Sequence, residues 1–279
     1  MWKYYNHALL SDVAPHKEKD AEAALASPDW KKPRTWLIRY TDHYDDPSYT
    51  EWWYCIKDDP LDLSALKSKR RNEINKGIRN FEVRLIDAED HREALYRIYD
   101  NVLLSYERFS GRRLTREQYY KSISTWKDRY TTYGAFLRES GELAGFAQVR
   151  EFDDFIDFSG CKADPDYEKF GCNAALVCFL CEHYADRISS GQYILDGERN
   201  ILHQTHFQDY LEKYFGFRKA YCKINVRYKA WFKLLVKIIY PFRNVFVKTA
   251  LCRKPFFEKI GAILKLEEIV RKQNKSQKP

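Results

Sequence analysis

The sequence lacks any apolar run close to the roughly 18 residues that a membrane-spanning helix needs. Its first ten residues, MWKYYNHALL, mix polar and aromatic positions and lead to no small-residue cleavage site, so we expect no secretory signal peptide. Apart from the CxxC of Cys178 and Cys181, no cysteine or histidine pair has the spacing of zinc ligands. We therefore expect a cytoplasmic protein without a metal site.

Cysteine usage supports the same compartment. The seven cysteines are an odd number and are spread through strand-like and helix-like patterns, which suggests reduced thiols. Cys178 and Cys181 lie inside an apolar helical pattern, so we interpret them as small buried helix residues, with redox or zinc chemistry as the alternative. Aromatic residues make up 16% of the chain, which argues against disorder.

Positive charge is concentrated near the C-terminus. The chain has a formal net charge of +8, and its segment from Phe232 to Lys259 holds seven basic residues against the single acid Glu258. Lys229, Lys233 and Lys237 recur every four residues, Pro241 interrupts the pattern, and a second amphipathic helix is expected from residue 256 to about 271. This composition is typical of an interfacial helix on an anionic membrane. A helix packed on its own domain with snorkelling lysines is the alternative.

Three regions are predicted along the chain. Residues 1–34, with three prolines and no clear period, are expected to form an N-terminal arm with one short helix near residues 20–25. Residues 35–228 alternate strand and helix patterns, which predicts a mixed α/β domain. Residues 229–279 are expected to form a basic, amphipathic, helical appendage.

The α/β region has clear element signals. Alternating or apolar runs predict strands over residues 36–41, 51–57, 81–85, 133–137, 143–149 and 155–160. Ser64 is expected to cap a helix that runs to about Lys76, with Gly77 as its stop. Apolar residues at three- and four-residue steps predict a helix around residues 95–103, and Thr115 is expected to open another.

The stretch Asp164–Leu176, DPDYEKFGCNAAL, opens an almost wholly apolar helix. The strand YIL, another helix and a closing strand with the run LEKYFGFRK at residues 211–219 follow. This order resembles the second half of a GNAT-type acyltransferase domain. The resemblance implies an α/β fold with a mixed sheet flanked by helices. It also implies a glycine-containing turn whose backbone N–H groups hold an anionic donor.

By this resemblance, the cofactor-binding residues are Phe170, Gly171, Cys172, Asn173 and Ala174. Glu168 and Asn173 depart from the family pattern, which has Gln or Arg and a small residue at these places. A carboxylate beside a pyrophosphate is electrostatically unfavourable. The alternative is therefore a glycine turn at a helix start that binds no ligand.

The stretch Leu66–Gly77, LKSKRRNEINKG, resembles the basic helix of FemAB-like members of this superfamily. Those members transfer amino acids from aminoacyl-tRNA or act on cell-envelope precursors. Lys69, Arg70 and Arg71 are the substrate-binding candidates, because clustered cations suit phosphate groups. A solvated charged face is the alternative.

A third polar cluster, DGERN at residues 196–200, follows the strand YIL. Ligands in open α/β sheets gather at the carboxyl ends of strands. We expect Asp196, Glu198 and His203 to be catalytic, since a carboxylate or imidazole there could deprotonate an amine or hydroxyl. Arg199 and Thr205 are further substrate-binding candidates. A simple turn with a helix cap at Asn200 or Thr205 is the alternative.

Together these features predict an acyl or aminoacyl transferase acting on an amine or hydroxyl acceptor, including a cell-envelope sugar or lipid-linked precursor. The donor would be acyl-CoA or aminoacyl-tRNA, with a base near Asp196 and carbonyl polarisation by N–H groups from Gly171 to Asn173. The expected location is cytoplasmic, with peripheral contact at the inner face of the membrane.

Two other interpretations stay open. One is a non-catalytic, degenerate GNAT-fold binding module at the membrane surface. The other is a nucleic-acid binder, which would use the basic helix and the C-terminal lysines. Because no DNA-recognition motif is present, we expect no DNA partner, and tRNA only as an aminoacyl donor.

Overall fold

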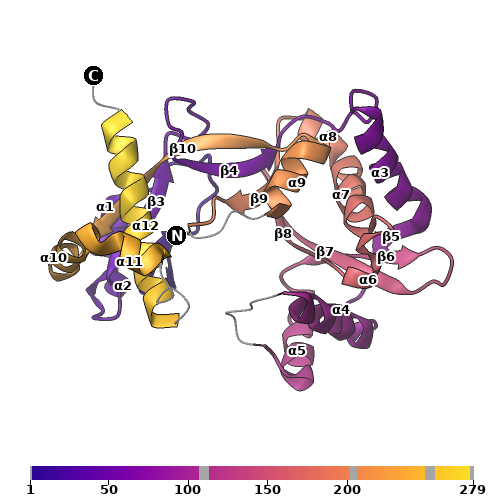
Figure 1. Ribbon diagram of the computed structural model, residues 1–279, viewed down its shortest axis with the longest axis horizontal. Coiled ribbons are helices and arrows are strands. Elements are labelled where there is room, and N and C mark those ends of the chain that lie inside the picture. The colour runs from indigo at the N-terminus through magenta and orange to yellow at the C-terminus, as the bar shows by residue number, and fades with distance from the viewer. Residues whose placement is uncertain (1, 107–112, 202–205, 249–254, 277–279) are drawn as a thin grey trace. The chain divides into compact units, whose positions relative to one another are not determined.

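The computed structural model describes residues 2–106, 113–201, 206–248 and 255–276 (Figure 1). Ten strands are hydrogen-bonded in the order β1-β2-β3-β10-β4-β9-β8-β7-β6-β5. Their bounds are β1 Trp2–Tyr5, β2 Ala8–Ser11, β3 Leu37–Asp42, β4 Trp52–Lys57, β5 Phe81–Leu85, β6 Thr131–Leu137, β7 Leu143–Glu151, β8 Ile156–Ala163, β9 Ile194–Glu198 and β10 Arg218–Tyr228. The predicted strands are confirmed to within a few residues at their ends.

The helices alternate with these strands over most of the chain. Their bounds are α1 Ala21–Ala26, α2 Pro28–Lys31, α3 Ser68–Asn80, α4 Arg92–Ser105, α5 Arg116–Ile123, α6 Pro165–Glu168, α7 Cys172–His183, α8 Ala185–Ser189, α9 His206–Phe215, α10 Ala230–Ile239, the 3-10 turn η1 Tyr240–Phe242, α11 Arg243–Lys248 and α12 Pro255–Ser276. The mixed sheet flanked by helices is the predicted fold class.

The chain divides into two compact units. Unit 1 comprises residues Met1–Tyr54, Glu198–Thr205 and Lys219–Pro279, and unit 2 comprises Cys55–Gly197 and His206–Arg218. The limits of these units fall within β4, at the end of β9 and within β10.

Unit 2 is built on an antiparallel sheet of β5, β6, β7 and β8, with β9 added parallel to β8. Helix α7 covers one face of this sheet, and α4 and α5 cover the other (Figure 1). Eight residues of α7 are buried, as the apolar sequence predicts for a core helix. Its Cys178 and Cys181 are free thiols buried in this core, which confirms their packing role.

Helix α3 crosses α7 at two glycines, which corrects the predicted end of α3. A Cβ on Gly77 would lie 2.4 Å from the carbonyl oxygen of Gly171, and one on Gly171 would lie 2.9 Å from Gly77 Cα. Gly77 is therefore required by close packing inside the helix, and α3 continues to Asn80. Ser64 is not its cap either, because the hydroxyl of Ser64 donates to Asp62 while Lys67 holds the N-cap position.

The N-terminal residues belong to unit 1 and contribute two strands to its sheet. The hairpin of β1 and β2 joins the sheet because β2 pairs in parallel with β3. The short helix expected near residues 20–25 is α1, capped by the carboxylate of Asp20. Strand β10 pairs antiparallel with the other edge of β3.

Helix α12 is longer than predicted and is fixed to this sheet by Gln273. The buried amide of Gln273 accepts a hydrogen bond from Ile224 N at 2.8 Å and donates one to Ile224 O at 3.1 Å. Leu266 and Ile269 of α12 pack in one core cluster with Trp52, Cys222 and Ile224.

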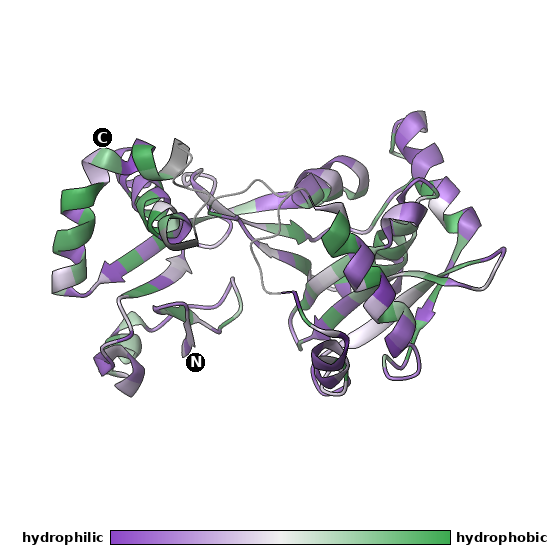
Figure 2. Ribbon diagram, turned by 60° about the horizontal axis from the view of Figure 1, so that its bottom comes forward, coloured by the Kyte–Doolittle hydropathy of each residue, from purple (hydrophilic) through white to green (hydrophobic). Residues whose placement is uncertain are grey.

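Helix α10 has one buried edge and one exposed apolar face. Phe232 and Val236 pack against Leu37, whereas Leu234 and Ile238 are each 59% exposed. The helix lies at the far left in Figure 1 and is largely hydrophobic in Figure 2. In the described parts of the chain, every helix is too short or too polar to cross a lipid bilayer.

Candidate functional site

The two parallel strands of unit 2 separate soon after they meet. Strand β8 pairs with β9 only at Ile156↔Ile194 and Asp157↔Leu195. Beyond this point β8 stays paired with β7 as far as Ala163, while β9 continues through Asp196 without a β8 partner. Asp196 therefore lies where the β8–β9 pairing ends, at the carboxyl end of β9, which is where ligands gather in open α/β sheets.

Asp196 is the most perturbed carboxyl in this region. Its pKa is raised from 3.8 to about 7, mainly by burial; the amide of Gln208 opposes the shift, and the nearby charge of Asp157 adds to it. Gln208 is itself buried on α9, and its Nε2 lies 3.5 Å from the Asp196 carbonyl oxygen. A carboxyl with this pKa is suited to exchange protons near neutral pH.

Cys161 lies near Asp196 and in turn interacts with two further groups, Asn173 and Tyr210. The thiol of Cys161 on β8 lies 3.6 Å from the side-chain oxygen of Asn173 at the start of α7. Burial and then the charge of Asp196 raise the Cys161 pKa to about 12. Burial, followed by the charge of Cys161, also raises the pKa of the Tyr210 phenol. Cys161 and Tyr210 are therefore neutral near pH 7, and a thiolate nucleophile at Cys161 is disfavoured.

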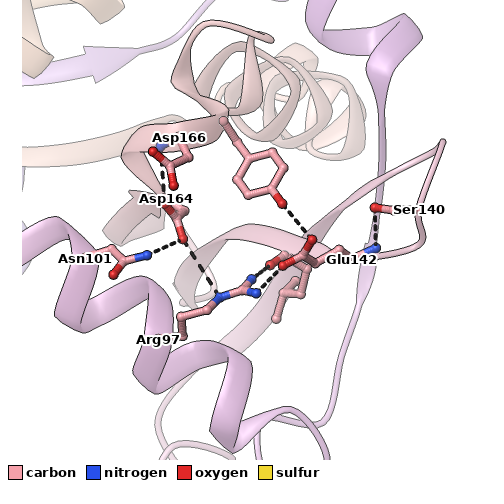
Figure 3. Close-up of polar contacts among 8 residues, drawn as sticks. Arg97, Asn101, Ser140, Glu142, Asp164 and Asp166 are labelled. Carbon is pink, nitrogen blue, oxygen red and sulfur yellow. Dashed lines mark hydrogen bonds and ion pairs between the residues drawn. The ribbon is translucent and has the colours of Figure 1, made fainter.

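The turn from β8 into α7 is held by a polar network (Figure 3). The buried carboxylate of Asp164 accepts hydrogen bonds from Asn101 at 2.8 Å and from the backbone N–H of Asp166 at 3.2 Å. Arg97 lies 3.9 Å from the same carboxylate and donates to Leu143 O at 2.7 Å.

The other end of this network is Glu142, which pairs with Arg97. Tyr167 donates to Glu142 at 2.6 Å, and this bond lowers the pKa of Glu142. Helix α4 and the β6–β7 hairpin thus fix the segment that precedes Gly171. The sequence pattern had shown that Asp164 and Tyr167 lead into the turn, but not what binds them.

Gly171 is the N-cap of α7 and has φ 90°, a left-handed conformation that favours glycine. No side chain caps α7, so the N–H groups of its first turn, including those of Cys172 and Asn173, receive no capping hydrogen bond from a side chain. Cys172 and Ala174 are buried, Asn173 is half-buried and Phe170 is exposed. Of the five predicted cofactor-binding residues, Phe170, Gly171 and Asn173 are thus at least partly accessible.

Glu198 and Arg199, predicted to act with Asp196, belong to unit 1. Glu198 is ion-paired with Arg39, and an N–H of Arg199 donates to Glu51 O. The guanidinium of Arg199 also lies 4.6 Å from the centre of the Trp53 ring. Because these pairings lie within unit 1, a shared role with Asp196 stays a prediction. The predicted residues His203 and Thr205 lie outside the described residues.

The three predicted substrate-binding cations lie in the first turn of α3. Lys69 is exposed, Arg70 and Arg71 are half-buried, and Arg71 donates to Ser64 O at 3.4 Å. In the described ranges none of the three is ion-paired with a carboxylate. Their charge is therefore available to an anionic ligand.

Comparison with solved structures reveals the same fold in known proteins. The C-terminal domain of a protein assigned as a lysylphosphatidylglycerol synthetase of Agrobacterium fabrum aligns with a TM-score of 0.53 and 12% identity, covering 85% of this chain and 83% of that one. FemX aligns with a TM-score of 0.52 and 9% identity, covering 78% of each chain. No protein-family model and no curated protein matches the sequence. The chain therefore has the predicted GNAT/FemAB-like fold.

Proposed function

We propose that the protein transfers an acyl or aminoacyl group to an amine or hydroxyl acceptor, with Asp196 as the general base. The observation that carries this proposal is the carboxyl of Asp196, with a pKa of about 7, placed where β9 parts from β8. The fold supports it, since the neighbours named FemX and lysylphosphatidylglycerol synthetase share this architecture.

The reaction requires one proton transfer and one bond exchange. Asp196 accepts the proton of the attacking nitrogen or oxygen, which then forms a bond to the acyl carbon. The N–H groups of Cys172 and Asn173 stabilise negative charge on the carbonyl oxygen. The carbon–sulfur or carbon–oxygen bond of the donor breaks, and the proton on Asp196 is then available to the leaving thiolate or alkoxide.

The donor carries phosphate groups in this proposal, as acyl-CoA or aminoacyl-tRNA. Lys69, Arg70 and Arg71 supply cationic contacts for its phosphates. The acceptor class includes amino sugars and lipid-linked precursors of the cell envelope. This agrees with the lipid product in the name of the Agrobacterium neighbour.

Turnover by an Asp196→Asn variant tests the proposal. Acetyl-CoA, longer acyl-CoAs and aminoacyl-tRNAs are supplied as donors, with glucosamine or phosphatidylglycerol as acceptors, and donor consumption is measured. We expect Asp196→Asn to lower turnover by about 100-fold or more, the usual scale for loss of a general base. Donor binding measured by calorimetry should be unchanged. A variant that turns over at the wild-type rate would remove Asp196 from the reaction.

We also propose that unit 1 contacts an anionic membrane surface, which is the second candidate function. The supporting observation is the outer face of α10 and η1, where Trp231 is 52% exposed and Phe242 62% exposed. Lys233 and Lys237 are exposed on the same helix. Each such cation contributes about 1 kcal/mol of attraction at an anionic leaflet.

Vesicle sedimentation distinguishes this contact from internal packing. The wild-type chain should sediment with phosphatidylglycerol vesicles at low salt and be released at high salt, because charge attraction is screened. Lys233→Gln together with Lys237→Gln should weaken this binding. Lys3→Gln with Lys223→Gln is a control of equal charge on the same unit. Absence of binding to anionic vesicles at low salt would overturn the proposal.

A further inference from the structure

A cavity of about 510 Å³ lies entirely within unit 1. Its walls come from the β1–β2 hairpin, from β3, from residues 198–201 and from α12. This volume is in the range of small-molecule sites, which bind most of a ligand's surface. The catalytic proposal for Asp196 does not use this cavity.

The greater part of the cavity wall is apolar. Leu10 and Leu37 come from the sheet, while Ala262, Ile263 and Leu266 come from α12. Trp36 also lines the cavity, and its ring is stacked on His7 at 3.8 Å. Such a surface excludes water and favours an aliphatic chain.

Two arginines, Arg39 and Arg199, are among the polar residues that line the cavity. Arg39 is ion-paired with Glu198 and is 14% exposed, and Arg199 bonds Glu51 O. One N–H of each guanidinium is taken by these acceptors, so further donors of both remain for a ligand. The charged residues of the lining are the cations Arg39, Arg199 and Lys259 and the acids Glu198 and Glu258, which leaves an excess of one positive charge. Burial lowers the pKa of Arg199 from its usual value, which indicates that its charge is incompletely solvated.

We infer that this cavity binds an anionic amphiphile, with one aliphatic chain and a carboxylate or phosphate head. The chain lies against the apolar wall of α12, and the head accepts hydrogen bonds from Arg39 and Arg199. Guanidinium groups bind both kinds of oxyanion in a bidentate manner.

The wall of the cavity continues into the base of α10. The ring of Trp36 lies 5.1 Å from that of Phe232 and 6.1 Å from that of Trp231, measured between centroids. Ile263 lines the cavity and also packs against the cluster of Phe232 and Val236. The cavity thus adjoins the helix whose outer face is apolar, which suits a ligand taken from a lipid phase.

Calorimetric titration of the full chain tests this inference. The ligands are decanoate, decyl phosphate and the uncharged decyl glucoside, each below its critical micelle concentration, and inorganic phosphate alone. We expect at least one of the two anionic amphiphiles to bind, and decyl glucoside and phosphate to bind at least tenfold more weakly. Binding of one anion alone identifies the head group.

Three variants locate the site. Arg199→Gln removes head-group donors, and Ala262→Phe fills the apolar part, so each should weaken binding about tenfold or more. Arg227→Gln removes the same charge from unit 1 outside the cavity lining and should bind as the wild type does. Thermal unfolding shows whether each variant is folded. If Arg199→Gln is not folded, Arg199→Lys, which keeps the charge, is used in its place.

Failure of this inference is separable from failure of the proposed transfer reaction. Asp196 lies outside the cavity lining, so the Asp196→Asn variant should bind the amphiphile as the wild type does. If neither anionic amphiphile binds, if decyl glucoside binds equally well, or if Ala262→Phe binds as tightly as wild type, the inference is overturned. None of these outcomes depends on turnover.

Discussion

Asp196 is a carboxyl whose surroundings move its pKa from 3.8 to about 7. Between these values the folded chain keeps the proton and the unfolded chain releases it. The free energy of unfolding therefore falls as pH rises from about 4 to 7, by roughly 4 kcal/mol over the full window.

Asp196→Asn should remove this pH dependence, because an amide does not titrate. Urea unfolding at several pH values should show the variant gaining stability relative to wild type as pH rises from 4 to 7. Asp209→Asn, an exposed carboxyl on α9, is the control and should leave the slope in place. An Asp196→Asn variant with the wild-type slope would show that the carboxyl is not buried in its protonated form.

The sequence predicted Asp196 as a candidate site residue but did not predict the groups that lie near it, for a physical reason. Asp196 follows a predicted strand, and that position alone marks it as a site candidate. Cys161 and Gln208 come from β8 and α9, and only tertiary packing brings them to Asp196. Their residue types carry no distinct signal in a local pattern.

At the scale of elements, the crossing of α3 and α7 depends on Gly77. Gly77→Ala would place a Cβ 2.4 Å from the Gly171 carbonyl oxygen and 3.0 Å from Ala175 N. We expect a loss of about 1–3 kcal/mol in the free energy of unfolding, the usual cost of overpacking. Gly160→Ala on β8 meets nothing within 4 Å and is the matched control. Equal stability of the two variants in denaturant unfolding would contradict this account of the crossing.

The basic turns of α3 carry a second prediction at this scale. Changing Lys69, Arg70 and Arg71 together to Gln should weaken the binding of aminoacyl-tRNA and reduce its salt dependence, since fewer phosphate counterions are released. Fluorescence anisotropy over a range of salt concentrations measures both effects. Arg84→Gln, Arg116→Gln and Lys127→Gln form a control of equal charge in unit 2. If the two triple variants bind aminoacyl-tRNA equally well, the basic residues of α3 form only a solvated, charged face.

Local signals predicted most helices and strands but misjudged α3. Thr115 and Gln118 form the capping box that opens α5, and both side chains act within one turn. Gly77 looked like a stop because glycine commonly ends helices. Its actual partner is Gly171, 94 residues away, so no pattern near Gly77 could have shown that it belongs inside the helix.

At the scale of the whole molecule, unit 2 was easier to predict than unit 1. Most of unit 2 is one continuous stretch, Cys55–Gly197, so its order of strands and helices is visible in the sequence. Unit 1 combines three separated segments, and its cavity is lined by residues as far apart as Leu10 and Leu266. The N-terminal hairpin was missed because its strands are only four residues long and join the sheet through β3.

The pH dependence of kcat/KM for donor consumption tests the central claim most directly. With the donor and acceptor that give turnover, the account predicts a rate that rises about tenfold per pH unit below pH 7 and levels off above it, because Asp196 must be ionised to accept a proton. Asp196→Asn should lack this rise and stay about 100-fold or more below the plateau. A wild-type profile that is flat through pH 7, or an Asp196→Asn profile that follows it, would contradict the assignment of Asp196 as the general base.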